Sequence, residues 1–165
     1  HLYRAKGGKG TINLNSNASM PDAVAALGEA GLSSLRVSLN SVRPSVYERY
    51  YRPRGYNFAH VDESVRRAKE KGVYVSLNLL YFPGFTDTQN ESDALIEFIK
   101  TGQIDCLQLR NLNIDPDFYM ELMADVDTGP SAGFINFRKR LKKECPGLHI
   151  GYFNPYVHEK QQSEL

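Results

Sequence analysis

The sequence has few cysteines, no long apolar run and almost no excess of charge. Cys106 and Cys145 are its two cysteines in 165 residues, too few for a disulfide scaffold and too far apart for a metal-binding knuckle. No apolar run approaches the roughly 18 residues that a membrane helix needs. The formal net charge of +1 gives no reason to expect a nucleic acid or an acidic membrane as a partner. We therefore expect one cytoplasmic domain spanning residues 1–165.

A unit of helix, glycine and strand recurs four times along the chain. Alternating apolar and polar residues predict four strands after such helices, and a fifth before the first of them. The predicted strands are 11–17, 35–40, 73–80, 106–111 and 148–153. Glycine at each helix exit suits the left-handed backbone of an αβ turn. These glycines are Gly31, Gly72, Gly102 and Gly147.

Alternating helices and strands predict right-handed crossovers and a parallel sheet, so the fold class is α/β. A closed eight-stranded barrel takes about 250 residues, and we therefore predict a partial, open parallel β/α barrel with about five strands. Residues 43–57 carry four tyrosines and are predicted to form a βα loop enlarged for contact. Thr88 and Glu91 have capping-box spacing, and Asp115 followed by Pro116 predicts a further helix start.

Four consecutive strands carry aliphatic residues on one face and polar residues on the other. Leu35 and Val37 alternate with Arg36 and Ser38, for example. Strands covered on both faces are normally continuous aliphatic runs, and a buried polar group without a partner costs several kcal/mol. The polar face must therefore meet water, a ligand or other polar groups. A truncated barrel would leave this face exposed to water. Its amide, hydroxyl and guanidinium groups instead favour directional binding of a small polar molecule.

Ligand sites in such folds lie at the carboxyl ends of the strands. One rim is therefore expected to carry Asn15, Asn17, Ser38, Asn40, Asn78, Tyr81, Gln108 and Arg110. No strand end carries a cluster of Asp, Glu or His, which disfavours metal-dependent barrel enzymes, and a carboxylate pair for glycoside hydrolysis is lacking. Asp87 and Asp115 are interpreted as turn and cap residues, and His60, His149 and His158 as surface or packing residues.

The order and spacing of several short motifs are similar to those of the radical S-adenosylmethionine (SAM) superfamily. In residues 11–115 they resemble the third to sixth β/α units of that family's partial barrel. The motifs are Asn15-Ser16-Asn17, residues 36–41 followed by Pro44 and Tyr47, then Arg52 and Phe58, then Pro83-Gly84 with Thr86-Asp87, and Glu91.

The resemblance implies a [4Fe–4S] cluster held by a C-x-x-x-C-x-x-C motif, with SAM bound to its fourth iron. Reductive cleavage of SAM then yields a 5′-deoxyadenosyl radical that abstracts a hydrogen atom from the substrate. It also implies which residues contact SAM. These are Asn15 and Asn17 at its amino acid end, Ser38 and Asn40 at its ribose or carboxylate, and Asn78 with the backbone near Tyr81 and Pro83 at its adenine. Arg52 and Arg110 are candidates for a carboxylate, and Gln108 completes the set.

The three-cysteine motif does not occur in this sequence. We therefore expect the SAM- and substrate-binding portion of a larger enzyme, with no cluster bound to this chain alone and no radical chemistry by it. The first residue, His1, fits a fragment, and the barrel edge left by truncation would favour self-association. Two alternatives stay open: a non-catalytic module for a nucleotide or SAM-like ligand, and another α/β-barrel enzyme, although no strand end carries the lysine that an aldolase would favour. Neither a catalytic residue nor a substrate follows from the sequence.

Overall fold

The computed structural model describes residues 2–151 and contains one parallel sheet in the order β1-β2-β3-β4-β5. The strands are β1 (Asn13–Ser16), β2 (Ser34–Leu39), β3 (Tyr74–Tyr81), β4 (Cys106–Asn111) and β5 (His149–Ile150). The helices are α1 (Leu2–Ala5), α2 (Pro21–Glu29), α3 (Pro44–Tyr51), α4 (Phe58–Glu70), α5 (Gln89–Thr101), α6 (Pro116–Leu122) and α7 (Gly133–Glu144). The predicted α/β class and open parallel sheet are confirmed.

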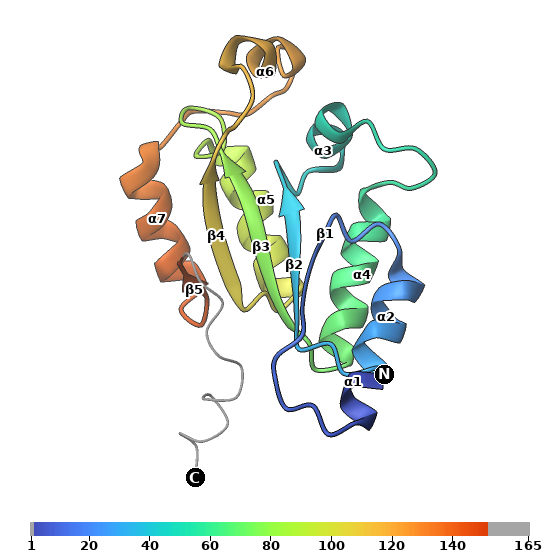
Figure 1. Cartoon of the computed structure of the whole chain (residues 1–165). Coiled ribbons are helices and arrows are strands. Elements are labelled where there is room, and N and C mark those ends of the chain that lie inside the picture. Colours follow the sequence, from blue (N-terminus) through green and yellow to red (C-terminus); the bar gives the residue numbers. More distant parts are fainter. Residues whose placement is uncertain (1, 152–165) are drawn as a thin grey trace.

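Helices cover one face of this sheet, and among residues 2–151 no helix covers the other face, which is turned toward the viewer in Figure 1. Helix α5 lies behind β3 and β4, while α2 and α4 flank one side and α7 the other. Helices α3 and α6 stand beyond the arrowheads, at the carboxyl ends of the strands. We call the uncovered face the inner face, because it would line the inside of a barrel.

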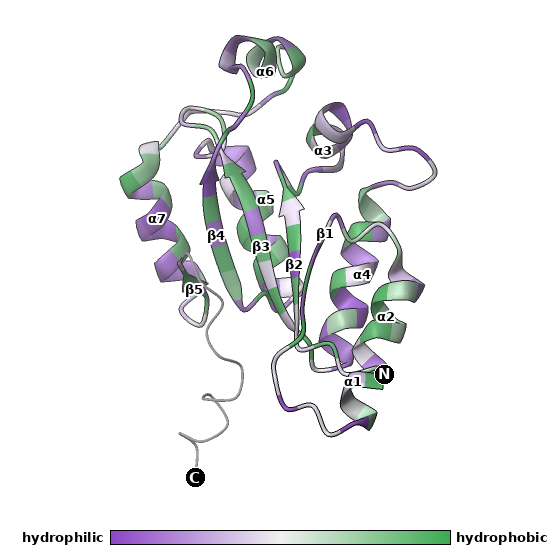
Figure 2. Cartoon of the chain, in the orientation of Figure 1, coloured by the Kyte–Doolittle hydropathy of each residue, from purple (hydrophilic) through white to green (hydrophobic). Residues whose placement is uncertain are grey.

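Strand alternation places the core on the helix side. Leu35, Val37, Leu77 and Leu107 are fully buried, and they pack with Val61 and other residues of the helices. Each such side chain contributes about 1.5–3 kcal/mol on burial. Figure 2 shows hydrophobic and hydrophilic residues alternating along β3 and β4, so the same strands supply both the core and a polar inner face.

The glycines at the helix exits have two different roles. Gly31 and Gly72 are left-handed, with φ of 94° and 69°, as predicted. The prediction was wrong for Gly102, which is still right-handed, and left-handed Gln103 (φ 48°) turns the chain instead. A Cβ on Gly102 would lie 2.9 Å from the Phe98 carbonyl oxygen, so this glycine permits a close approach. Gly147 is not left-handed either.

Residues 43–57 differ most from the prediction, because they contain helix α3. Three of the four tyrosines of the predicted contact loop, Tyr47, Tyr50 and Tyr51, lie on this helix and pack against aromatic rings. Tyr47 is fully buried and stacks on Tyr51 with ring centroids 4.6 Å apart. The predicted strand 11–17 is observed only as Asn13–Ser16. The last predicted strand is observed as His149–Ile150, and its residues 152–153, like His158, lie outside the described residues.

Candidate functional site

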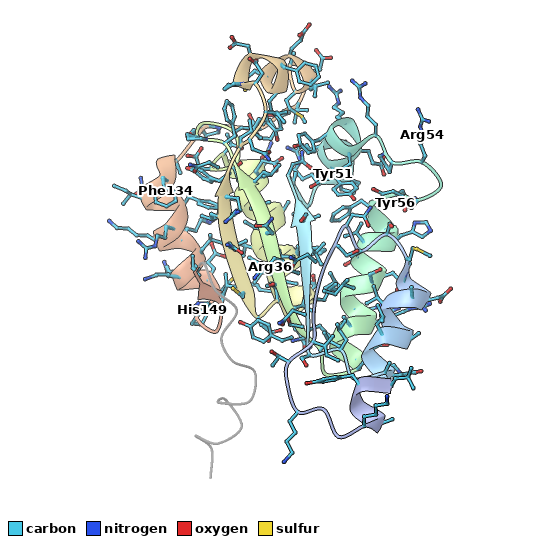
Figure 3. The ribbon with its side chains drawn as sticks, viewed as in Figure 1. Arg36, Tyr51, Arg54, Tyr56, Phe134 and His149 are labelled. Carbon is cyan, nitrogen blue, oxygen red and sulfur yellow. The ribbon has the colours of Figure 1, made fainter. Side chains whose placement is uncertain are left out.

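Strand register arranges the inner-face residues in rows that cross the sheet. Residues paired in register lie side by side and share a face. One row, which we call the Ser38 row, consists of Ser38, Asn78 and Gln108. A second, the Arg36 row, consists of Asn15, Arg36, Ser76, Cys106 and His149. Figure 3 shows Arg36 near the centre of the sheet.

The Ser38 row is the part of the predicted rim that the structure brings together. Ser38 and Asn78 are half-buried, while Gln108 is buried at 5% exposure. Arg110 follows two residues after Gln108, in register with Leu80, and is exposed. The row therefore offers hydroxyl and amide groups, which both donate and accept hydrogen bonds without carrying a charge.

Asn15 and Asn17 lie at the edge formed by β1, and both are exposed. Asn15 is in register with Arg36. The Asn17 amide donates to the Tyr56 hydroxyl at 3.3 Å, and that hydroxyl lies 3.4 Å from the hydroxyl of Tyr47. Asn17 is thus tied to the segment around α3, which positions it at the carboxyl end of β1.

Asn40 lies beneath the rim, because it is buried to 1% exposure. Its amide nitrogen lies 3.3 Å from the Val46 carbonyl oxygen and 3.4 Å from the Tyr119 hydroxyl, donating to both. Within residues 2–151 its Oδ1 atom has no hydrogen-bond donor. Burial raises the pKa of Tyr119 to about 12, although the Asn40 amide opposes that shift. Asn40 therefore joins α3 to α6, and its amide nitrogen is already engaged in these two hydrogen bonds.

Tyr81 also departs from the predicted rim, because its side chain lies on the helix side of the sheet. Its ring contacts Phe134 and Phe137, with centroids 5.3 and 5.9 Å away. Its hydroxyl donates to Asp87 Oδ2 at 2.7 Å, and burial raises its pKa. The Tyr81 side chain is thus engaged away from the inner face. Arg52, by contrast, is exposed at the end of α3 with a left-handed φ of 46°.

Asp87 organises the loop between β3 and α5. It is 2% exposed, and its Oδ1 accepts hydrogen bonds from the Gly84 backbone N–H and the Ser131 hydroxyl, both at 2.9 Å. Gly84 is left-handed with φ 80°, and Pro83 beside it is exposed. The interpretation of Asp87 as a turn residue is confirmed. That of Asp115 as a cap is also confirmed, because its side chain accepts from the Phe118 backbone N–H at 2.9 Å.

A buried ionic cluster behind the rim was not predicted. Ser41 donates to Glu91 at 2.6 Å, and the Arg43 guanidinium lies 3.0 Å from the same carboxylate. Arg43 also donates to the Asp127 carbonyl oxygen at 2.8 Å. Burial raises the pKa of Glu91, while Ser41 and Arg43 oppose that shift. The predicted capping box is wrong, because Glu91 turns toward Ser41 and the Thr88 hydroxyl donates to the Phe85 carbonyl.

The donor groups suit SAM but not an iron–sulfur cluster. SAM carries an amino acid, a ribose diol and an adenine, for which neutral amide and hydroxyl groups are suitable partners. An iron–sulfur cluster needs several thiolates converging on one site. Cys106 lies on the inner face and Cys145 in the core beside α7, both buried. Within the described residues, no three His, Cys, Asp or Glu side chains are grouped to hold a metal ion.

Several solved structures share this fold. Streptococcus suis SuiB bound to S-adenosylmethionine is 12% identical, with a TM-score of 0.57 over 88% of this chain and 33% of that one. HydG, a maturase of the [FeFe]-hydrogenase, is 19% identical, with a TM-score of 0.58 over 91% of this chain and 35% of that one. A radical SAM methyltransferase from Sphaerobacter thermophilus is 14% identical, with a TM-score of 0.55 over 89% and 41%. The chain thus spans only a third to two fifths of these proteins.

Curated protein sequences gave no match. Across residues 2–151, no helix is both long and apolar enough to cross a membrane. The sequence model of the radical SAM superfamily matches residues 2–96, which is more than half of the chain. The match includes β1, β2, β3 and the start of α5, and thus two of the three strands that carry the Ser38 row. The chain therefore belongs to the radical SAM superfamily.

Proposed function

We propose that this chain supplies a SAM- and substrate-facing wall of a radical SAM enzyme. The family uses SAM and a [4Fe–4S] cluster in its intact enzymes. In the intact protein, SAM would be cleaved reductively and a hydrogen atom abstracted from the substrate. Because the cysteines present do not fit a cluster, this chain supplies none of the iron ligands.

The in-register Ser38 row is the observation that supports this proposal most directly. Its three side chains come from β2, β3 and β4 and meet on the inner face near the carboxyl ends of the strands. We assign the ribose and adenine of SAM to Ser38, Asn78 and Gln108, with the backbone near Pro83 beside them. Asn15 and Asn17 are assigned to the amino acid end. Asn40 and the Tyr81 side chain are left out, because each is engaged elsewhere.

Three further proposals concern the chain as a whole. Residues 1–165 form one domain, in keeping with the single sheet. Cys106 and Cys145 are buried and form no disulfide, which suits a reducing cytoplasm. The edge strands β1 and β5 are the places where two copies would associate, because within residues 2–151 each pairs with a strand on one side only.

Titration of the isotopically labelled chain with SAM, followed by amide NMR, tests the assignment. We expect weak, saturable shifts at Ser38, Asn78 and Gln108, since the iron that anchors SAM is not held by this chain. Asn78→Ala should weaken binding about 3- to 10-fold, the range for one hydrogen bond. Asn136→Ala on the exposed face of α7 is the matched control and should bind normally.

Two results would contradict the proposal. Shifts confined to the outer helices would place SAM elsewhere, and an unchanged affinity in Asn78→Ala would remove the Ser38 row from the site. Adenosine binding as tightly as SAM would favour a non-catalytic nucleotide module instead. Stoichiometric iron after anaerobic reconstitution of the chain would overturn the statement that it supplies no cluster ligands.

A further inference from the structure

The described strands carry positive charge and no negative charge. β1 to β5 contain two arginines, Arg36 and Arg110, and no aspartate or glutamate. Asp87 and Glu91, which follow β3 in the sequence, are turned into buried networks behind the rim. Exposed acidic residues, among them Asp117 and Glu121, lie on α6 beyond the carboxyl ends and not on the strands. Summed charges of one sign on a surface produce a potential that attracts ligands of the opposite sign. The inner face therefore favours an anion.

Arg36 lies among hydrogen-bond donors within this face. Its in-register neighbours are Asn15 on one side and Ser76 on the other, and partners in adjacent strands lie about 4.8 Å apart. His149 ends the same row. A guanidinium presents a planar fork of N–H groups that matches the two oxygens of a carboxylate or phosphate. The exposed Asn15 amide beside it can bind a remaining oxygen, whereas the Ser76 hydroxyl is buried and donates to the Leu35 carbonyl oxygen at 3.5 Å.

The depth of Arg36 separates it from the proposed SAM contacts. Arg36 precedes Ser38 by two residues on the same face, so the Arg36 row lies about 6.6 Å farther from the carboxyl edge. If SAM is held by the Ser38 row and by residues at the carboxyl edge, Arg36 faces the molecule that binds deeper than SAM, which is the substrate. Arg36 is half-buried and its Nε atom is buried, so the exposed remainder of the side chain is the part that can reach that molecule.

We propose that Arg36 binds a carboxylate or phosphate group of the substrate, so that the substrate class is an anionic small molecule or side chain. The assignment to substrate depends on the proposed function, because it assumes that SAM occupies the Ser38 row. Arg110, two rows nearer the edge and exposed, is assigned to the carboxylate of SAM itself. Arg36 would thus bind the oxyanion of the substrate deeper in the inner face, and Arg110 would bind the carboxylate of SAM near the carboxyl edge.

Inorganic phosphate is the probe, and the Arg36 side-chain N–H resonance is the readout. We expect a saturable shift, and Arg36→Gln should weaken phosphate binding about tenfold or more, as expected for loss of a charge-assisted bidentate contact. Arg36→Lys keeps the positive charge but loses the planar fork of N–H groups. Its phosphate affinity should therefore lie between those of the unmodified chain and Arg36→Gln. Arg138→Gln, at an exposed position on α7, is the matched control and should not change binding. Amide spectra verify that each variant is folded.

Titrating phosphate in the presence of SAM distinguishes the two sources of the oxyanion. Phosphate that still binds at Arg36 with SAM present supports the substrate assignment, and SAM shifts at Ser38 should survive in Arg36→Gln. Competition between SAM and phosphate at Arg36 would overturn that assignment, and so would an equal loss in Arg138→Gln. If phosphate binds at Arg36 but SAM binds nowhere, the proposed function is wrong and the oxyanion site stands.

Discussion

Replacing Asp87 by alanine should destabilise the protein through the loop between β3 and α5. This buried carboxylate accepts three hydrogen bonds, from the Tyr81 hydroxyl, the Gly84 backbone N–H and the Ser131 hydroxyl. A hydrogen bond to a charged group contributes about 1.5–3 kcal/mol, and contributions of neighbours in one network do not simply add. Because Tyr81 and Asp87 are 8% and 2% exposed, water cannot readily replace the lost partner. We expect Asp87→Ala to lower the free energy of unfolding by about 3–5 kcal/mol.

Urea denaturation followed by circular dichroism measures this change. Asp87→Asn keeps one acceptor oxygen for Gly84 and Ser131 and should cost only about 1–2 kcal/mol. A double-mutant cycle with Tyr81→Phe should give a coupling energy of about 1–2 kcal/mol. Asp125→Ala, at an exposed position, is the matched control and should stay within about 0.5 kcal/mol of the unmodified chain. A loss below about 1 kcal/mol in Asp87→Ala would show that the network does not hold the loop.

Two further changes have defined outcomes. Burial raises the pKa of Glu91 above its unfolded value, so its contribution to stability is present at low pH and is lost as the pH rises through the folded pKa. The free energy of unfolding of the unmodified chain minus that of Glu91→Gln should therefore increase as the pH falls, and a flat difference between pH 4 and 8 would contradict the assigned shift. Gln103→Gly should stabilise the chain by about 0.5–1 kcal/mol, because Gln103 is left-handed with φ 48°. A lower thermal midpoint for this variant would show that the left-handed backbone at Gln103 does not destabilise the chain.

The local alternation of apolar and polar residues was sufficient to predict the sheet. Alternation along residues 35–40 and 106–111 placed Leu35 and Leu107 in the core and Ser38 and Gln108 on the inner face, as observed. This worked because an aliphatic face and a polar face differ at every second residue, and a register shift would bury the wrong set. The Ser38 row followed from the same pattern, since parallel neighbours bring equivalent positions together.

Contacts between distant segments could not be predicted in this way. Asn40 meets Tyr119, which lies 79 residues later, and Glu91 meets Ser41, which lies 50 residues earlier. No local pattern links such partners, so Asn40 was expected on the rim and Glu91 in a capping box. Helix α3 was missed for a different reason. Its tyrosines were interpreted as part of a loop enlarged for contact, whereas the side chain of Tyr47 is buried in the core.

The strand order follows the chain order throughout, and this has a consequence for synthesis. Each strand pairs only with the strands that come before and after it in the sequence. A polypeptide leaving the ribosome can therefore add one hydrogen-bonded strand at a time, without waiting for a distant segment. The buried β2–β3 pair, with six residues in register, can form before β4 has been translated. Growth of the sheet in the direction of translation should leave, besides the edge at β1, only the latest strand awaiting a partner at any moment.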